Sequence, residues 1–449
     1  MNKKATKATK ELIKFIKKSP DAFHAVKNAV KLLEAEGFTR LSEADEWVLE
    51  GGHGYYMTRN ASSIIAFRIP KNVKNASFMI CASHTDSPTF KLKDVCEKNT
   101  GAYVTLNVEG YGGMIISSWF DRPLSVSGRA VIKRDGKLVT KCVNIDRDLL
   151  ILPNVAIHMN RAVNEGYTYN IATDVLPVLS ATEGAAGIYD IVAEELDCKR
   201  DELVSADLYL YNRTEGTILG AAGELFSCPR IDNIMCAYSS LIGFTEASET
   251  DGVIPVWCAF DNEETGSSTK QGAASSMLLD TLTRICEGIS AELCRVLPSS
   301  FMVSADNGHA KHPSHPEQSD GMNAPLMNGG IVIKYNASQR YTTDALSAAI
   351  FKEICEKAGV PVQNYNNRSD KPGGSTLGGI SNTRVALNTV DIGLAQLAMH
   401  SSYETAGCAD TLFMIDAMRE FFGTKIKYSA TGSDEYEIVF AKVEHIKAK

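Results

Sequence analysis

The feature that most constrains the fold is an apolar run, Val253 to Phe260 (VIPVWCAF), that ends directly in 261–266 (DNEETG). An uncharged run of this length, bounded by turn residues, predicts a buried strand of a mostly parallel sheet. The acidic side chains then lie at the carboxyl edge of the sheet, where open α/β sheets bind ligands. Glu263 and Glu264 are neighbouring like charges, whose crowding is relieved by a cation or a proton. An exposed acidic turn gives the same short pattern, so the choice depends on the other strands.

A second apolar run leads to a histidine in the same way. Residues 76–83 (ASFMICAS) run straight into His84-Thr85-Asp86. Taken alone, a histidine after a strand is more often structural than a ligand. His84 and Asp86 are two residues apart, however, and such side chains point the same way on an extended backbone. A carboxylate beside an imidazole is the usual partner of a metal-binding histidine. His84 is therefore a candidate ligand, and Asp86 is the group that orients it.

Three further segments place metal donors near the ends of predicted elements. Asp306 follows the apolar run 300–304, Asp232 precedes a helical stretch, and His400 follows a strand at 385–390. Asp232 has a second interpretation as a helix N-cap, because Asp is favoured at that position. Together with the first two segments, these residues supply a set of imidazole and carboxylate groups that suits a metal ion.

Composition excludes several classes of protein. A chain of 449 residues is too long for one ordinary core, so we expect two domains or one domain with an insertion. Its 44% apolar residues are enough to bury a substantial core. The net charge of -8 argues against nucleic-acid binding. No apolar run reaches about 18 residues and no apolar region follows the basic start, so we expect neither a membrane span nor a signal peptide. The eleven scattered cysteines favour free thiols and a cytoplasmic location.

The middle of the chain differs in character from both ends. From Asp94 onward, short alternating strands appear, and Asp135-Gly136 is a hairpin signal between two of them. We predict an inserted β-rich domain at 94–215, between the two parts, 1–93 and 216–449, of an α/β domain. The predicted fold class is α/β, with a mixed, mostly parallel sheet that has helices on both faces. His158 lies in the insert, and from the residues alone it fits a buried core histidine best.

Six ordered motifs resemble those of the aspartyl aminopeptidase family. They are ASHTDSP (82–88), PRIDN (229–233), DNEETGS (261–267), SADNGHAKHP (304–313), IKYNASQRY (333–341) and AMHSSYE (398–404). Any one of them alone is weak evidence, but the ordered set is specific and extends over most of the chain. The resemblance implies a cytosolic dinuclear metallopeptidase whose α/β domain is interrupted by a β-rich dimerisation domain.

The resemblance also implies a role for each matching residue. The metal ligands are His84, Asp232, Glu264, Asp306 and His400, and Asp232 bridges two ions. Asp86 orients His84. Glu263 is the general base that moves a proton from water to the leaving amine, a role typically worth about 10²–10⁴-fold. Two divalent cations are the implied cofactors, and the mixed nitrogen and oxygen ligands suit Zn²⁺ but also Mn²⁺ or Co²⁺.

The implied reaction is removal of an N-terminal residue, preferably Asp or Glu, from peptides with a free N-terminus. Lys334 is expected to face the acidic side chain of the substrate, and Tyr341 of the same motif is assigned to the substrate site. The resemblance changes the interpretation of His158, which it places at the active site of a neighbouring subunit. It also implies assembly into a dodecamer built from dimers. The residues themselves, with aromatic side chains such as Tyr111 and Trp119 in the insert, support only an oligomer.

Two alternatives remain at this stage. A dinuclear deacylase or carboxypeptidase of the same architecture shares the ligands but acts on another part of its substrate. A non-catalytic assembly or cargo protein shares the fold but does not need a base such as Glu263 beside the ligands. An aminopeptidase loses activity on peptides with a blocked N-terminus, which distinguishes it from the first alternative. Hydrolysis by the Glu263→Gln variant with its metal retained distinguishes an enzyme from the second.

Overall fold

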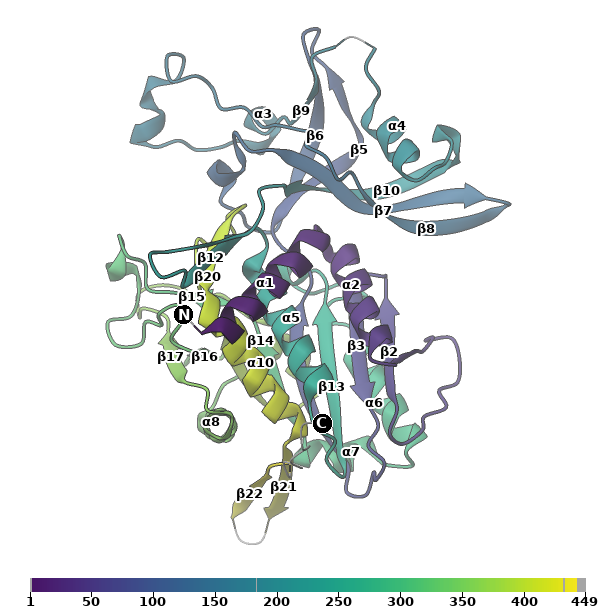
Figure 1. Ribbon diagram of the computed structural model, residues 1–449, viewed down its shortest axis with the longest axis vertical. Coiled ribbons are helices and arrows are strands. Elements are labelled where there is room, and N and C mark those ends of the chain that lie inside the picture. Colours follow the sequence, from purple (N-terminus) through teal and green to yellow (C-terminus); the bar gives the residue numbers. More distant parts are fainter. Residues whose placement is uncertain (1, 183, 431–432, 442–449) are drawn as a thin grey trace.

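The computed structural model describes residues 2–182, 184–430 and 433–441. These residues form a larger part built on a nine-stranded sheet and a smaller part built on a second sheet (Figure 1). The smaller part lies beyond the carboxyl end of strand β13, at the edge of the large sheet where the sequence predicts the ligands (Figure 1).

The large sheet has the strand order β1-β2-β3-β13-β4-β14-β18-β16-β17. Its strands are β1 (Thr39–Arg40), β2 (Gly54–Arg59), β3 (Ser63–Arg68), β4 (Ser77–His84), β13 (Val253–Phe260), β14 (Phe301–Ala305), β16 (Ile331–Tyr335), β17 (Val362–Asn366) and β18 (Asn388–Gly393). The central strands β13, β4, β14 and β18 run parallel, and the pairs β2–β3, β3–β13 and β16–β18 are antiparallel. The predicted mixed, mostly parallel sheet is therefore confirmed.

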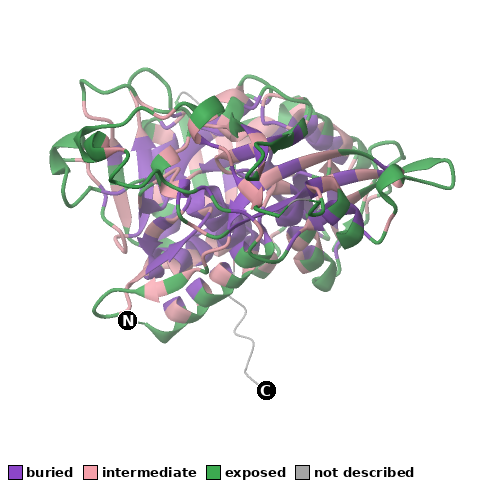
Figure 2. Cartoon of the chain, turned by 90° about the horizontal axis from the view of Figure 1, so that it is seen from above, coloured by how far each residue is buried: buried purple, intermediate pink, exposed green. Residues whose placement is uncertain are grey.

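Two hydrophobic cores lie on opposite faces of this sheet. In β4, Met79 and Cys81 pack in one core, while Phe78, Ile80 and Ala82 pack in the other, because successive side chains of a strand point to opposite faces. Helices α1 (Lys3–Lys18), α2 (Ala22–Ala35), α5 (Ile231–Glu246), α8 (Ala345–Ala358) and α10 (Cys408–Gly423) contribute to the first core, and α6 (Met277–Gly288), α7 (Leu293–Val296) and α9 (Leu377–Asn382) to the second. Figure 2 shows the buried strands enclosed by exposed loops.

The second sheet is antiparallel and has the strand order β8-β7-β10-β5-β6-β9. Its strands are β5 (Thr89–Asn99), β6 (Val104–Tyr111), β7 (Leu124–Arg134), β8 (Lys137–Asn144), β9 (Val178–Ser180) and β10 (Leu203–Asn212), and the helices α3 (Ile171–Asp174) and α4 (Ile188–Glu195) accompany them. A hydrophobic core of its own lies against it. The predicted hairpin is present, because Arg134 pairs with Lys137 across the Asp135-Gly136 turn. The sheet begins at Thr89, whereas the predicted insert begins at residue 94.

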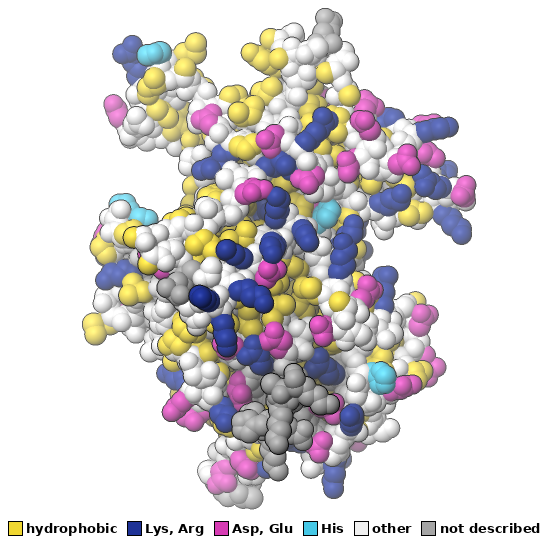
Figure 3. All heavy atoms as spheres, viewed as in Figure 1, with side chains coloured by type: hydrophobic (Ala, Val, Ile, Leu, Met, Phe, Trp, Pro, Cys, Tyr) yellow, Lys and Arg dark blue, Asp and Glu magenta, His cyan; other side chains and the backbone are white. Residues whose placement is uncertain are grey.

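Smaller elements complete the chain. A five-stranded sheet joins β11 (Thr217–Leu219), β12 (Leu225–Cys228), β15 (Gly308–His309), β19 (Ala395–Leu397) and β20 (Glu404–Gly407), and β21 (Lys425–Ala430) pairs with β22 (Asp434–Val439). On the face shown in Figure 3, Lys and Arg side chains are interspersed with Asp and Glu. Within the described residues, no helix has the length and apolar character needed to cross a membrane.

Candidate metal centre

The site forms where three neighbouring parallel strands end at the same edge of the large sheet. His84 is the last residue of β4 and pairs with Phe260 at the end of β13. A short 3-10 helix, Glu263–Thr265, follows β13, and Asp306 follows β14. Because the strands are parallel and in register, side chains far apart in the sequence meet at this edge.

Asp232 lies between two imidazoles at the centre of the site. Its Oδ1 is 3.5 Å from Nε2 of His84, and its Oδ2 is 3.5 Å from Nε2 of His400. Each imidazole faces one further carboxylate: Asp306 Oδ1 is 3.4 Å from Nε2 of His84, and Glu264 Oε2 is 3.4 Å from Nε2 of His400. The five predicted ligands therefore come together as two imidazole–carboxylate pairs on either side of Asp232.

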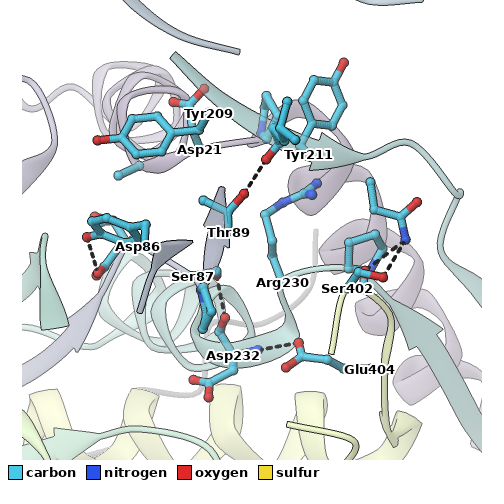
Figure 4. A pocket seen from close by; sticks show the side chains of 18 of the residues that line it. Asp21, Asp86, Ser87, Thr89, Tyr209, Tyr211, Arg230, Asp232, Ser402 and Glu404 are labelled. Carbon is cyan, nitrogen blue, oxygen red and sulfur yellow. Dashed lines mark hydrogen bonds between the residues drawn. The ribbon is translucent and has the colours of Figure 1, made fainter. Parts of the chain in front are cut away.

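The N-cap interpretation of Asp232 is wrong. Helix α5 begins at Ile231, its N-cap is Arg230, and Asp232 lies inside the first turn with non-helical backbone angles. Its carboxylate is directed to the imidazoles instead. Its backbone N–H donates to Glu404 Oε2 at 3.0 Å, and its backbone oxygen accepts from the Ser87 hydroxyl at 2.6 Å (Figure 4).

The donor set fits a metal ion. Single ligand atoms of His84, Asp232 and Glu264 lie within 4.8 Å of one another. Asp232 Oδ1 and Glu264 Oε1 are buried and have no hydrogen-bond partner among the described residues. A buried carboxylate oxygen without a partner is costly, and a cation placed among these atoms removes that cost. Imidazole nitrogen with carboxylate oxygen is a combination suited to Zn²⁺ and similar ions.

Burial and crowding perturb the acids of the site. Burial raises the pKa of Glu263 to about 7. Burial, reinforced by the charge of Asp232, raises the pKa of Glu264 well above its usual range. Burial alone would also raise the pKa of Asp232, but the close contacts with the His400 and His84 imidazoles outweigh it and keep that pKa below its usual range. Perturbed pKa values of this kind are typical of functional sites.

Asp86 contacts both the histidine it is expected to orient and the turn that follows β13. The Nδ1 atom of His84 is 3.1 Å from the backbone oxygen of Asp86 and 3.4 Å from its Oδ1. The carboxylate of Asp86 accepts hydrogen bonds from the backbone N–H groups of Glu263 and Glu264, each at 3.2 Å. Asp86 therefore links the His84 segment to the turn that contains Glu263.

A cavity of about 210 Å³ opens on these groups. It is lined by the five predicted ligands and by Glu263, Lys334 and Tyr341. Lys334 is buried, its Nζ donates to the backbone oxygen of Asn307 at 2.8 Å, and the same atom lies 3.6 Å from Asp306 Oδ2. Burial alone would lower the pKa of Lys334, but attraction to Asp306 outweighs it, so the pKa is raised and the side chain stays charged.

A neighbouring cavity of about 230 Å³ shares His309, Tyr365 and Met399 with the first. His158 lines neither of them: it lies on an exposed stretch of the second sheet's connections, and within this one chain the structure does not bring it to the cluster. Its predicted place in a neighbouring subunit stays a prediction.

Sequence reasoning gave no role to Glu404, although it ends the quoted motif AMHSSYE. Glu404 is buried and accepts hydrogen bonds from the backbone N–H groups of Asp232 (3.0 Å) and His400 (2.9 Å) and from Gln396 Nε2 (3.1 Å). Burial raises the pKa of Glu404 to about 8. Its only signal in the sequence is its position four residues after His400, which does not separate it from an exposed acid.

Two imidazoles and several buried acids at the carboxyl edge of an α/β sheet define a metal-dependent hydrolase. A family model described as "Aminopeptidase I zinc metalloprotease (M18)" matches residues 15–422, and the chain belongs to this family. It is therefore a zinc metallo-aminopeptidase, and the resemblance drawn from the six motifs is confirmed at the level of the family.

Curated relatives and solved structures agree with this family assignment. A probable M18 family aminopeptidase 2 of Clostridium novyi is 43% identical over 431 residues, which cover 94% of this chain and 99% of the relative. An aspartyl aminopeptidase of Dictyostelium discoideum is 34% identical, with 95% and 98% covered. A solved Ape4 and Nbr1 complex contains a chain with a TM-score of 0.90 and 34% identity, and 94% and 87% of the two chains are covered. The S. cerevisiae mApe1 dodecamer gives a TM-score of 0.82 and 25% identity, with 93% and 96% covered.

Proposed function

We propose that this M18 enzyme removes the N-terminal residue, preferably Asp or Glu, from peptides with a free N-terminus. The single observation that supports a two-ion centre is the placement of the Asp232 carboxylate, with one oxygen toward His84 and the other toward His400. His84 and Asp306 would hold one ion, His400 and Glu264 would hold the other, and Asp232 would be shared. Bound divalent ions in such a centre lower the pKa of water and polarise the oxygen of the scissile carbonyl.

Glu263 is the proposed general base and acid. It lines the cavity beside the ligands, and its raised pKa of about 7 suits a group that must both take up and release a proton near neutral pH. It removes a proton from the attacking water as the new C–O bond forms. It then delivers that proton to the leaving nitrogen as the C–N bond breaks, which releases the shortened peptide. Asp86 holds the backbone of Glu263 in place through the bond to its N–H group.

Lys334 is the proposed selector for acidic residues. A buried ammonium in the cavity wall attracts a carboxylate side chain far more strongly than a neutral one, because water does not screen the interaction there. The Nζ atom of Lys334 lies 5.6 Å from the ring centroid of Tyr341, and this proximity supports a shared role in substrate binding. The Dictyostelium relative that carries the name aspartyl aminopeptidase supports the same preference.

Self-association is part of the proposal. The stretch that holds His158 exposes Val155, Ile157 and Met159, and hydrophobic side chains also appear over the second sheet in Figure 3. Exposed apolar patches of this kind are typical of interfaces. The dodecamer of the S. cerevisiae homologue supports a dodecamer here. In that assembly we expect His158 to reach a neighbouring site. The free thiols of all eleven cysteines support a reducing, cytoplasmic location.

The test is a panel of peptides that differ only in the first residue (Asp, Glu, Ala or Lys), each with a free and an acetylated N-terminus. We expect fastest cleavage of the free Asp and Glu peptides, loss of activity after chelation, and recovery with added Zn²⁺, Mn²⁺ or Co²⁺. Equal rates on all four free peptides would remove the acidic preference. Release of a C-terminal residue, or of the acetyl group, would favour the carboxypeptidase or deacylase alternative.

A further inference from the structure

The metal centre receives contacts from residues 111–118, a segment that begins with the last residue of β6 and continues into the connection after that strand. We infer that this segment is a positioning element of the metal centre, acting on Asp86 through the Tyr111 hydroxyl and on His400 through the backbone carbonyl of Gly113. The inference rests on the proposed function, because it assigns a role to residues that act through the proposed ligands and their partners. It gives the second sheet a part in the chemistry as well as in assembly.

Tyr111 fixes the carboxylate of Asp86. Its hydroxyl donates to Asp86 Oδ2 at 2.7 Å and accepts from Asn262 Nδ2 at 2.8 Å. Asn262 directly precedes Glu263, and its own Oδ1 accepts from Gln271 Nε2 at 2.7 Å. The hydroxyl therefore connects the His84–Asp86 segment with the turn that presents the proposed base. Hydrogen-bonded partners of this kind hold ligands and reacting groups in their working geometry.

The backbone carbonyl of Gly113 holds the imidazole ring of His400 in one orientation. The Nδ1 atom of His400 lies 2.6 Å from the backbone oxygen of Gly113. A carbonyl oxygen only accepts hydrogen bonds, so Nδ1 is the donor, and Nε2 is the ring nitrogen that faces Asp232 and Glu264. The backbone N–H of Ile115 also donates to the backbone oxygen of His400 at 3.0 Å. Both the ring and the backbone of this ligand are thus held by the same segment.

Gly112 brings the segment into close contact with the side chain of Glu264. Its φ is +74°, and a Cβ built on it would lie 3.0 Å from the Cβ of Glu264. Glycine is favoured here both by the left-handed backbone and by the close approach. Further along, the Ser118 hydroxyl accepts from the backbone N–H of Ser402 at 2.8 Å, which fixes the turn that presents His400.

The first test removes one hydroxyl at a time from an aromatic pair. Tyr111 and Tyr209 are in T-shaped contact, with ring centroids 5.6 Å apart. Tyr111→Phe deletes the donor to Asp86 and keeps the ring, and Tyr209→Phe is the matched control because its hydroxyl does not bond Asp86. We expect Tyr111→Phe to lose about 10–100-fold in zinc affinity or kcat. We expect KM and Tm to stay near the wild-type values, and Tyr209→Phe to match wild type throughout.

Zinc affinity is measured by competition with a chromophoric chelator, so this readout does not depend on any substrate. Equal zinc affinity and equal kcat in Tyr111→Phe and Tyr209→Phe would overturn the role of Tyr111. A wild-type enzyme without preference for acidic residues would overturn the proposed specificity alone, since the zinc measurement would still decide the role of the segment.

The second test displaces the segment. Gly112→Ala adds a methyl group against Glu264, and Gly136→Ala is its control, because Gly136 has nearly the same φ (+75°) but no atom within 4 Å of its added Cβ. Both variants place Ala at a similar positive φ, so a drop in zinc affinity specific to Gly112→Ala supports the inference. Equal zinc affinity in two folded variants overturns it, and if Gly112→Ala does not fold, the Tyr111→Phe result decides.

Discussion

The carboxylate of Glu404 accepts a hydrogen bond at 2.9 Å from the backbone N–H of His400. His400 has a φ of +65°, in the left-handed region that non-glycine residues rarely adopt. The other oxygen of the carboxylate accepts from the backbone N–H of Asp232 at 3.0 Å. One buried acid thus sets the relative position of two predicted ligands that are far apart in the sequence.

We therefore expect Glu404→Gln to weaken zinc binding. The amide of Gln has a single acceptor oxygen, so one backbone N–H loses its partner, and a buried donor without a partner costs about 1–3 kcal/mol. Zinc affinity should fall by about 10–100-fold, as for other partners of metal ligands. Asp410→Asn is the matched control: Asp410 is also buried and accepts from the backbone N–H groups of Asn328 and Gly330, but it contacts none of the ligands. Equal zinc affinity in both variants would contradict the role given to Glu404.

Glu263→Gln should abolish most of the activity and leave the metal in place. The side chain lines the cavity beside the proposed ligands without belonging to them. Loss of a general base typically costs about 10²–10⁴-fold in rate. The measurement is kcat on an Asp-starting peptide together with the zinc content of the purified variant. Undiminished activity with zinc retained would mean that another group moves the proton and that Glu263 is not the general base.

Stability should depend on pH through Asp410. Burial raises the pKa of this carboxyl to about 7 in the folded protein, whereas an unfolded Asp has a pKa of about 3.9. The folded state then holds its proton more tightly than the unfolded chain. The contribution of Asp410 to the free energy of unfolding is therefore fully present below about pH 4 and is lost as the pH rises through about 7. Urea unfolding of wild type and Asp410→Asn across this range tests it, and a constant difference between the two would refute the assignment.

The sequence predicts the parts of the site that depend on strand ends. His84 and Asp306 follow apolar runs that become β4 and β14, and parallel register then brings them to one edge. It does not predict the contacts from the second sheet. Tyr111 meets Asp86, and Gly113 meets His400, across loops with no periodic pattern. These contacts depend on how two sheets pack together, which neither composition nor spacing encodes locally.

Asp232 and His158 illustrate two further limits. An Asp at the start of a helical stretch fits an N-cap as well as a ligand, and the sequence alone does not show that α5 begins at Ile231 with Arg230 as its N-cap. His158 is exposed, so the core interpretation that the residues alone favoured is wrong. A contact between His158 and another copy of the chain leaves no trace in the pattern of residues around it.

Lys334→Met should reduce activity selectively on peptides that begin with Asp or Glu. Met keeps an unbranched apolar stem that fills the cavity wall but removes the ammonium. On Asp-starting peptides we expect a loss in kcat/KM of about 10-fold or more, since a hydrogen bond to a charged group is typically worth about 1.5–3 kcal/mol. We expect a smaller loss on Ala- and Lys-starting peptides. The Nζ atom also lies 3.6 Å from Asp306 Oδ2, so zinc content must be measured in the same samples. Equal losses on all peptides with zinc reduced would assign Lys334 to the metal centre instead of to substrate selection.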